Sequence, residues 1–475
     1  MDLRACESSE SRFETYVEGL MSVIGHADRA KPLRDYCLGL AMPGERKSVE
    51  PLAAVTAPAR VAAQHQSLLH FVANAPWSDE AVLGTVRALV QPAIERGGPI
   101  EAWLIDDTGF PKKGRHSVGV ARQYCGELGK QDNCQVAVTL SIANRSASLP
   151  IAYRLYLPED WAADAERRAA AKVPEQIVFQ TKGAIALDQI RAACRQEVPR
   201  GVVVMDAGYG NNTRLRDAIS ALALRYIAGL ESSTTVWAPG VPPPPPWPGF
   251  GRRARHLRRA PGHQPVAVKA LAFSLPKTAW RSVTWREATG GRLTSRFARL
   301  RVRAARRDPQ GIRPEEWLLV EWPKSEPEPT KYWLSTLPED ISFARLVDLA
   351  KLRWRIERDY QDLKQELGLG HYEGRGWRGF HHHATLCIAA YGFLIAERAA
   401  IPPSAPRAAG MLQKPALPDG YRPRGAADPH RAPRSRLDRD HPPTAHRRSR
   451  QEALSMPVLR KTQQTTAANK RFLTQ

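Results

Sequence analysis

The first part of the chain, up to about residue 98, has its apolar side chains at helical spacing. In the stretch SDEAVLGTVRALV, Ser78 can cap a helix whose first turn carries two acidic residues. The apolar face of this helix consists of Val82, Leu83, Val86, Leu89 and Val90. Pro92 is expected to kink or end the helix. The pattern predicts a helical domain over residues 1–98.

From about residue 99 the apolar residues instead form short β-rich runs. These runs are expected to be strands at 102–106, 134–143, 149–157, 201–205 and 225–230. Helices are expected between them, over about 171–197 and 211–223. Such an order of strands and helices predicts a mixed α/β sheet covered by helices, with its first part at residues 99–235 and its last part at 336–398.

Residues 236–335 interrupt this pattern and are expected to form a β-rich insertion. It opens with VPPPPPWPGF and GRRARHLRRA, a composition typical of an exposed, partly disordered loop. Strands are then expected at 266–275, 280–285, 296–305, 315–322 and 331–337. At the other end, residues 399–475 are rich in proline, alanine, arginine and histidine, and we expect a basic, disordered tail.

The stretch KLRWRIERDYQDLKQELGL, residues 351–369, reads as a helix with two stripes. One stripe is polar and consists of Arg353, Glu357, Tyr360 and Lys364; the other is apolar and consists of Leu352, Ile356, Leu363 and Leu367. The polar stripe can hold a carboxylate over a site between two cations. It is equally typical of a solvated face with ion pairs one turn apart.

Charge and cysteine usage restrict the class of protein. Lysine and arginine number 70 against 48 acidic residues, which gives a net charge of +22 and favours a polyanionic partner. A basic enzyme without such a partner, or a single basic tail, would also account for the positive net charge. The cysteines are scattered without CxxC spacing, which indicates reduced thiols rather than a zinc site. No signal-like or membrane-spanning apolar run occurs, so we expect a cytoplasmic protein without a membrane partner.

Aspartates stand at the ends of two apolar strands. Asp106 and Asp107 follow AWLI, and Asp206 follows GVVVM. Ligands of α/β sheets gather beyond the carboxyl ends of strands, although aspartate and glycine also form ordinary turns. Together with a glutamate on a helix, such aspartates supply the oxygen ligands that two Mg²⁺ or Mn²⁺ ions require. Serine-triad and P-loop chemistry find no support, since neither GxSxG nor GxxxxGK[ST] occurs.

Three segments carry a resemblance to a known family: IDDTGFPKKGRHSVGVARQYCGELGKQDNCQ, VVMDAGYG and the helix at 351–369. The chain resembles bacterial insertion-sequence transposases of the DDE superfamily. These have an RNase H-like core interrupted by a β-rich insertion. In a large group of them the last acid lies in a Y-(2)-R-(3)-E-(6)-K pattern, and Arg353, Glu357 and Lys364 match its spacing. Ala350 stands at the tyrosine position.

The resemblance implies a metal-binding catalytic triad of Asp107, Asp206 and Glu357, holding two Mg²⁺ or Mn²⁺ ions. Asp107 is preferred to Asp106 because the family's first aspartate precedes a threonine-type residue, here Thr108. Asp106 would then point to the other face of the strand, and it remains the competing choice.

The resemblance also implies DNA contacts. Arg353 and Lys364 would bind phosphates of the DNA ends. Lys112, Lys113 and Arg115 follow the first strand, where they would hold backbone phosphates or be solvated.

The function implied is that of a metal-dependent transposase acting on double-stranded DNA. It would recognise the terminal inverted repeats of its element, cleave there and join the 3′-hydroxyl to target DNA. Residues 1–98 would bind the ends, and a homodimer would form the active complex, associated with the nucleoid when bound. The alternatives are a non-catalytic DNA-binding relic of a transposase and an RNase H-type nuclease without strand transfer.

Overall fold

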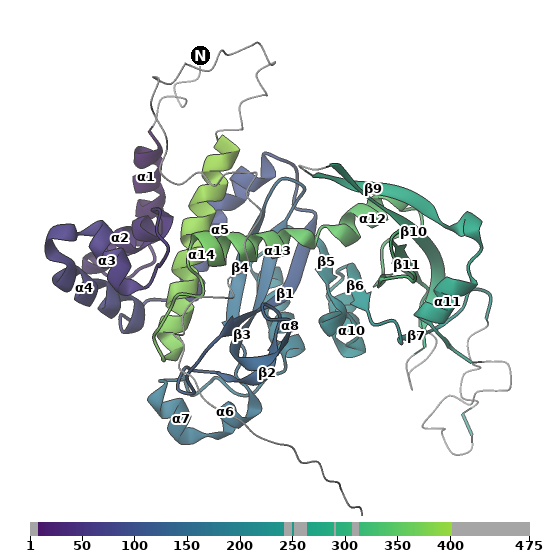
Figure 1. Cartoon of the computed structure of the whole chain (residues 1–475), viewed down its shortest axis with the longest axis horizontal. Helices are drawn as coiled ribbons and strands as arrows, with labels where there is room; N and C mark the ends of the chain where they lie inside the picture. Colours follow the sequence, from purple (N-terminus) through teal and green to yellow (C-terminus); the bar gives the residue numbers. More distant parts are fainter. Residues whose placement is uncertain (1–7, 242–248, 251–263, 289–290, 306–312, 401–475) are drawn as a thin grey trace, which may run out of the picture. The chain divides into compact units, whose positions relative to one another are not determined.

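The computed structural model describes residues 8–241, 249–250, 264–288, 291–305 and 313–400 (Figure 1). The described residues belong to one compact unit. Most of the polyproline and arginine loop and the expected basic tail lie outside them. Among the described residues, no helix combines the length and apolar character needed to cross a membrane.

The N-terminal part is helical, as expected. Its helices are α1 (Ser9–Met21), α2 (Ala30–Ala41), α3 (Val49–Thr56), α4 (Val61–Ala73) and α5 (Asp79–Glu95). Ser78 caps α5 by accepting the main-chain N–H of Ala81 at 3.1 Å. Pro92 does not end this helix, which continues to Glu95.

These helices pack on the last helix of the described chain, α14 (Trp377–Ala400). Arg12 on α1 forms an ion pair with Glu397 at 2.6 Å, and the Tyr16 hydroxyl donates to the Ala389 carbonyl at 2.8 Å. The expected helical domain therefore shares its core with the C-terminal part of the fold.

A central sheet supports the rest of the structure. Its first strands are β1 (Ala102–Pro111), β2 (Ala121–Cys125), β3 (Lys130–Ala143), β4 (Ser148–Leu155), β5 (Val202–Met205) and β6 (Tyr226–Leu230). They run in the order β2-β3-β1-β5-β6, with β4 beside β3. β1, β5 and β6 are mutually parallel, whereas β2, β3 and β4 pair antiparallel. The mixed α/β, RNase H-like class expected from the sequence is confirmed.

The insertion extends this sheet. β12 (Lys331–Ser335) pairs antiparallel with β6, and β11 (Glu316–Trp322), β10 (Gly291–Ala304), β7 (Thr235–Trp237) and β8 (Val266–Ala267) follow in the same sheet, with β9 (Arg281–Ala288) beside β10. In Figure 1 the insertion strands β9, β10 and β11 lie beyond β5 and β6 of the core. The strand expected at 266–275 is wrong beyond Ala267. Val268, Leu271 and Ala272 are buried at helical spacing, and the segment forms the helix α11 (Val268–Ser274).

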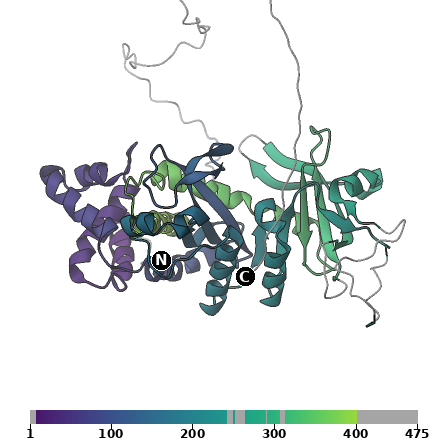
Figure 2. The same ribbon diagram turned by 90° about the horizontal axis from the view of Figure 1, so that it is seen from below.

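Helices cover both faces of the core strands. α8 (Lys182–Arg195) and α10 (Thr213–Ala221) pack with the side chains of Ile105 and Met205, whereas α12 (Phe343–Lys351) and α13 (Trp354–Gln361) pack with those of Leu104 and Val204. Figure 2 shows the same elements turned by 90°. The remaining short helices are α6 (Glu159–Ala163), α7 (Ala165–Ala170) and α9 (Ala207–Gly210). The helix expected over 171–197 begins only at Lys182, where Thr181 caps it.

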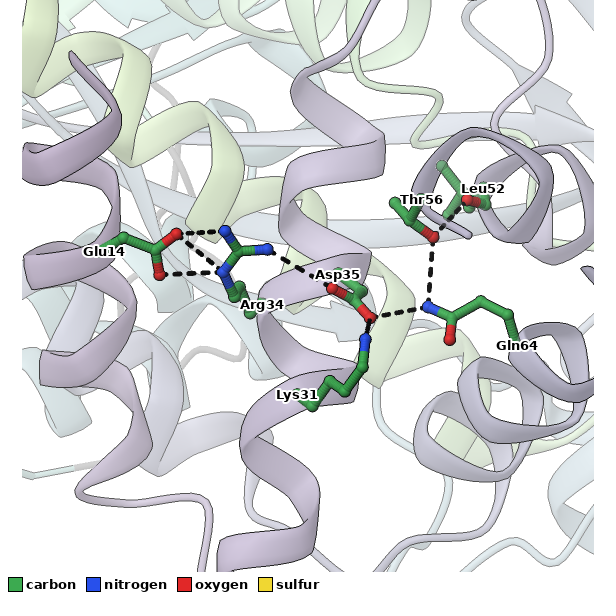
Figure 3. Close-up of polar contacts among 7 residues, drawn as sticks. All are labelled: Glu14, Lys31, Arg34, Asp35, Leu52, Thr56 and Gln64. Atoms are coloured by element: carbon green, nitrogen blue, oxygen red, sulfur yellow. Dashed lines mark hydrogen bonds and ion pairs between the residues drawn. The ribbon is translucent and has the colours of Figure 1, made fainter. Parts of the chain in front are cut away.

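A buried carboxylate joins the N-terminal helices (Figure 3). Asp35 on α2 accepts the side-chain amide N–H of Gln64, on α4, at 2.8 Å. It also accepts Lys31, and Gln64 reaches the Thr56 hydroxyl of α3. Next to it, Arg34 binds Glu14 of α1. Asp35 thus links α2 to α4, Gln64 extends the link to α3, and the Arg34–Glu14 pair joins α2 to α1.

We expect Asp35→Ala to lower the free energy of unfolding by about 1–3 kcal/mol, because the Gln64 amide and the Lys31 ammonium lose their buried acceptor. Urea unfolding of the full chain, followed by circular dichroism, measures this. Asp28→Ala is the matched control, since the Asp28 side chain is 91% exposed. Equal unfolding midpoints for the two variants would contradict the structural role of the network.

Candidate active site

The parallel pairing of β1 and β5 places two aspartates next to each other. Ile105 is the register partner of Met205, so Asp106 and Asp206 follow at equivalent positions. Side chains alternate along a strand, and Leu104 and Val204 face α12 and α13. Asp106 therefore points to the side of the sheet on which α13 lies.

Asp206 lies in a tight turn at the end of β5. Its backbone is still extended, and its carboxylate caps α9 by accepting the N–H of Tyr209 at 3.2 Å. Gly210 lets this short helix approach β6, because a Cβ at Gly210 would lie 2.0 Å from the Gly229 carbonyl oxygen. Gly210, the last residue of DAGYG, thus allows the turn after Asp206 to pack closely against the sheet.

Arg353 connects the sheet to the helix that carries Glu357. Its Nη1 lies 2.5 Å from Asp106 Oδ2, and its Nη2 lies 3.0 Å from Glu357 Oε1. Asp106 is mostly buried, whereas the Glu357 side chain is 62% exposed at the rim. The structure therefore groups Asp106, Asp206, Arg353 and Glu357 on one side of the sheet.

The charges of this group perturb one another. The pKa of the Asp106 carboxyl is raised to about 7, mainly by burial and also by the carboxylates of Asp206 and Asp107, whereas Arg353 opposes the shift. The pKa of Arg353 rises overall: burial lowers it, but the Asp106, Asp206 and Glu357 carboxylates outweigh that effect. A further cation at Asp106 and Asp206 would relieve the repulsion between these acids.

Asp107 lies on the opposite face of β1. Its carboxylate accepts Lys182 Nζ of α8 at 2.9 Å and the Tyr209 hydroxyl at 3.4 Å. The pairing of β1 with β3 has no bulge between Ala102 and Pro111, so consecutive side chains point to opposite faces. The choice of Asp107 over Asp106, which rested on Thr108, thus places the residue away from Glu357. Asp106 is the aspartate of this pair that shares a face of the sheet with Glu357.

The expected helix at 351–369 is divided. α12 ends at Lys351, α13 spans Trp354–Gln361, and a π-helical turn follows at Asp362–Glu366. The polar stripe nevertheless faces the sheet. Lys364 Nζ donates to the Gly109 carbonyl at 2.7 Å and to Glu127 at 2.6 Å. The Tyr360 hydroxyl pairs with Thr139 of β3 at 2.5 Å.

Buried contacts hold α13 in place. Asp359 accepts the Ser148 hydroxyl of β4 at 2.7 Å and the Tyr391 hydroxyl of α14 at 2.8 Å. Burial raises the pKa of the Asp359 carboxyl to about 7, and these two hydrogen bonds oppose the shift. From the insertion, Arg286 lies over the Trp354 ring at 3.7 Å. Sheet, last helix and insertion thus fix the element that carries Glu357.

The expected basic loop after β1 has two parts with different contacts. Lys112 donates to the Tyr372 carbonyl at 3.0 Å, and burial lowers the pKa of its ammonium group. Lys112 thus connects the loop after β1 to the segment that precedes α14. Lys113 and Arg115 are exposed and line a cavity of about 520 Å³ together with Arg122 and Arg167. This cavity presents a positive surface to which an anionic chain can bind.

The carboxylates of this group are of the chemical kind that a hard divalent cation binds, but they do not converge on one point. Among the described residues, no three carboxylate, imidazole or thiol groups form a cluster that could hold a metal ion. The Asp206 carboxylate contributes to the raised pKa of Asp106, while Glu357 is paired with Arg353. Carboxylate oxygens are the ligands that Mg²⁺ and Mn²⁺ prefer. A complete three-acid site requires Glu357 to leave Arg353.

The fold and these acids define a class: an RNase H-like core with one aspartate within β1, a second at the end of the adjacent parallel strand β5 and a glutamate on a facing helix. Comparison with known families agrees. The family described as DDE superfamily endonuclease matches residues 19–292, more than half of the chain, and the protein belongs to this family. The match includes Asp106, Asp107 and Asp206 and ends before Glu357.

One curated relative gives a more particular similarity. A protein named as a probable transposase for insertion sequence element IS701, from Microchaete diplosiphon, is 32% identical over 169 residues. The aligned region covers 35% of this chain and 41% of the relative. The chain therefore spans about two fifths of the length of that relative.

If Asp106 belongs to the metal site, Asp106→Asn should weaken Mn²⁺ binding by at least ~10-fold, because a hard ion loses a charged oxygen ligand. Calorimetric titration of the full chain with Mn²⁺ measures the affinity. Asp107→Asn is the control, since its carboxylate faces Lys182 on the other side of the sheet. A larger loss in the Asp107 variant would restore Asp107 as the ligand.

Proposed function

We propose that the protein is a DNA transposase of the insertion-sequence type. It binds the terminal inverted repeats of its element, cleaves the DNA there and joins the freed 3′-hydroxyl to a target. Membership of the DDE superfamily endonuclease family and the similarity to the IS701 protein support this proposal. The observation that carries it is the placement of Asp106 and Asp206 side by side beneath the helix of Glu357.

In the proposed reaction, Asp106, Asp206 and Glu357 hold two Mg²⁺ or Mn²⁺ ions. The ions, when bound, would activate the attacking oxygen and stabilise the leaving oxygen of the phosphodiester. The protein positions them through rigid elements: β1 carries Asp106, the capped turn after β5 carries Asp206, and α13 carries Glu357. Arg353 and Lys364, which flank the site, are proposed to bind phosphates of the DNA end.

The DNA is proposed to extend over basic surfaces around the site. Lys113 and Arg115 offer exposed charge beyond the end of β1, and Arg122 and Arg167 add to the same cavity. The N-terminal helices are proposed to recognise the repeat sequence. Two copies of the chain would act together, one at each end of the element.

We expect Glu357→Gln to lower Mg²⁺-dependent cleavage at the element's ends by at least ~100-fold, since the amide keeps the shape but removes the ligand charge. DNA flanking the gene supplies the candidate repeats for the assay. Binding to the same DNA should persist.

Glu366→Gln is the control for this experiment. Glu366 is exposed in the π-helical turn and lies beyond Lys364. Equal cleavage by Glu357→Gln and the unaltered protein would overturn the catalytic assignment. If Glu357→Gln loses cleavage but the unaltered protein binds and cleaves the repeats no better than random DNA, the protein is a nuclease. The proposal of a transposase then fails.

The double variant Lys113→Gln/Arg115→Gln should weaken DNA binding uniformly across sequences. It should also reduce the slope of log affinity against log salt by about 2, since each lost phosphate contact removes about one unit. Fluorescence anisotropy over a salt series measures the slope. Lys324→Gln, an exposed lysine between β11 and β12, is the control. An unchanged slope in the double variant would exclude this loop from the DNA interface.

A further inference from the structure

One guanidinium group occupies the position between two of the proposed metal ligands. Arg353 lies at the break between α12 and α13, so its side chain reaches back to β1 while remaining next to Glu357. It contacts Asp106 Oδ2 at 2.5 Å and Glu357 Oε1 at 3.0 Å. The side chain of Arg353 is only 26% exposed. Arg353 therefore neutralises the same acids that a divalent cation would neutralise.

Both oxygens of Asp106 are already engaged. Oδ2 accepts Arg353, and Oδ1 accepts the main-chain N–H of Asp107 at 2.9 Å. The N–H of Asp107 is part of the strand and cannot move away without distorting β1. The Arg353 side chain can move by rotation about its own bonds. Of the two partners of Asp106, Arg353 is therefore the one that an incoming metal ion can displace.

The other cations on this helical segment have partners elsewhere. Lys364 is held by Glu127 and the Gly109 carbonyl, Arg358 by Asp362, and Arg355 donates to the Ser146 carbonyl. Only Arg353, among these four, binds the acids of the site. A guanidinium forms bidentate hydrogen bonds with phosphate groups and with carboxylates. The phosphates of DNA therefore offer Arg353 an alternative to its carboxylate partners.

We propose that Arg353 is an internal counter-cation that the DNA backbone draws away from Asp106 and Glu357, so that DNA binding admits the metal ions. The inference rests on the proposed function and assigns Arg353 the role of coupling two ligands of that site. It also gives a reason for Glu357 to be turned toward Arg353 before DNA binds. Metal binding and DNA binding then strengthen each other by the same factor, as linkage requires.

The test is a Mn²⁺ titration of the full chain, in which electron paramagnetic resonance measures the free ion. The titration is made with and without a blunt-ended DNA duplex. In the unaltered protein, DNA should tighten Mn²⁺ binding by roughly 5- to 150-fold, the usual range for coupled sites. In Arg353→Gln, Mn²⁺ should bind tightly without DNA, and the further gain on adding DNA should largely vanish.

Arg358→Gln is the matched control, because Arg358 lies on the same helix and pairs with Asp362 instead of the site. It should behave as the unaltered protein. Arg353→Met, which keeps the buried stem, replaces the glutamine variant if circular dichroism shows that the latter does not fold. An equal gain on adding DNA in the Arg353 variant and the unaltered protein would overturn the proposal, since the metal would then simply bridge protein and phosphate.

Asp106→Asn separates this inference from the proposed function. If Asp106→Asn loses Mn²⁺ binding while Arg353→Gln leaves it unchanged, the metal site stands and the role of Arg353 as counter-cation fails. If neither variant alters Mn²⁺ binding, the metal lies elsewhere, and the assignment of the site fails together with the inference.

Discussion

The in-register parallel pairing of β1 and β5 is the constraint on which the proposed site depends. Ile105 and Met205 are register partners, so Asp106 within β1 and Asp206 at the end of β5 lie at neighbouring positions of the sheet. Two negative charges are thereby held close together on a rigid frame, where neither can move away from the other. Burial and this proximity raise the pKa of Asp106 to about 7. The negative charge of these carboxylates is stabilised by a nearby cation, and Arg353 supplies it.

The helix that covers these acids depends on contacts from distant parts of the chain. Lys351 of α12 binds both oxygens of Glu321, in the insertion strand β11, at 2.7 Å. Asp359 binds β4 and α14 through Ser148 and Tyr391. The insertion strands continue the core sheet, so they brace the Glu357 helix from one side while α14 supports it from the other. The long insertion is therefore part of the support of the site.

Local patterns predicted much of this fold. The strands at 134–143 and 201–205 and the capped helix after Ser78 follow from apolar spacing and capping chemistry. The segment 268–274 misled because a short, mostly apolar run suits either structure. Burial of Val268, Leu271 and Ala272, at helical spacing, fits the helix that forms. The π-helical turn after Gln361 leaves no mark in the sequence, since four of its five residues are good helix formers.

The choice between Asp106 and Asp107 shows where sequence reasoning reaches its limit. The alternation of side chains along β1 predicts that Asp106 and Asp107 point to opposite faces of the sheet. It does not predict which of these faces lies next to Glu357. That is settled by Leu104 and Val204, which pack with Leu346 and Ile356 far along the chain. Lys182 then matches Asp107 on the other face, so each aspartate has its own cation. Lys182 on α8 thus pairs with the carboxylate on one face of β1, and Arg353 pairs with the carboxylate on the face that carries Glu357.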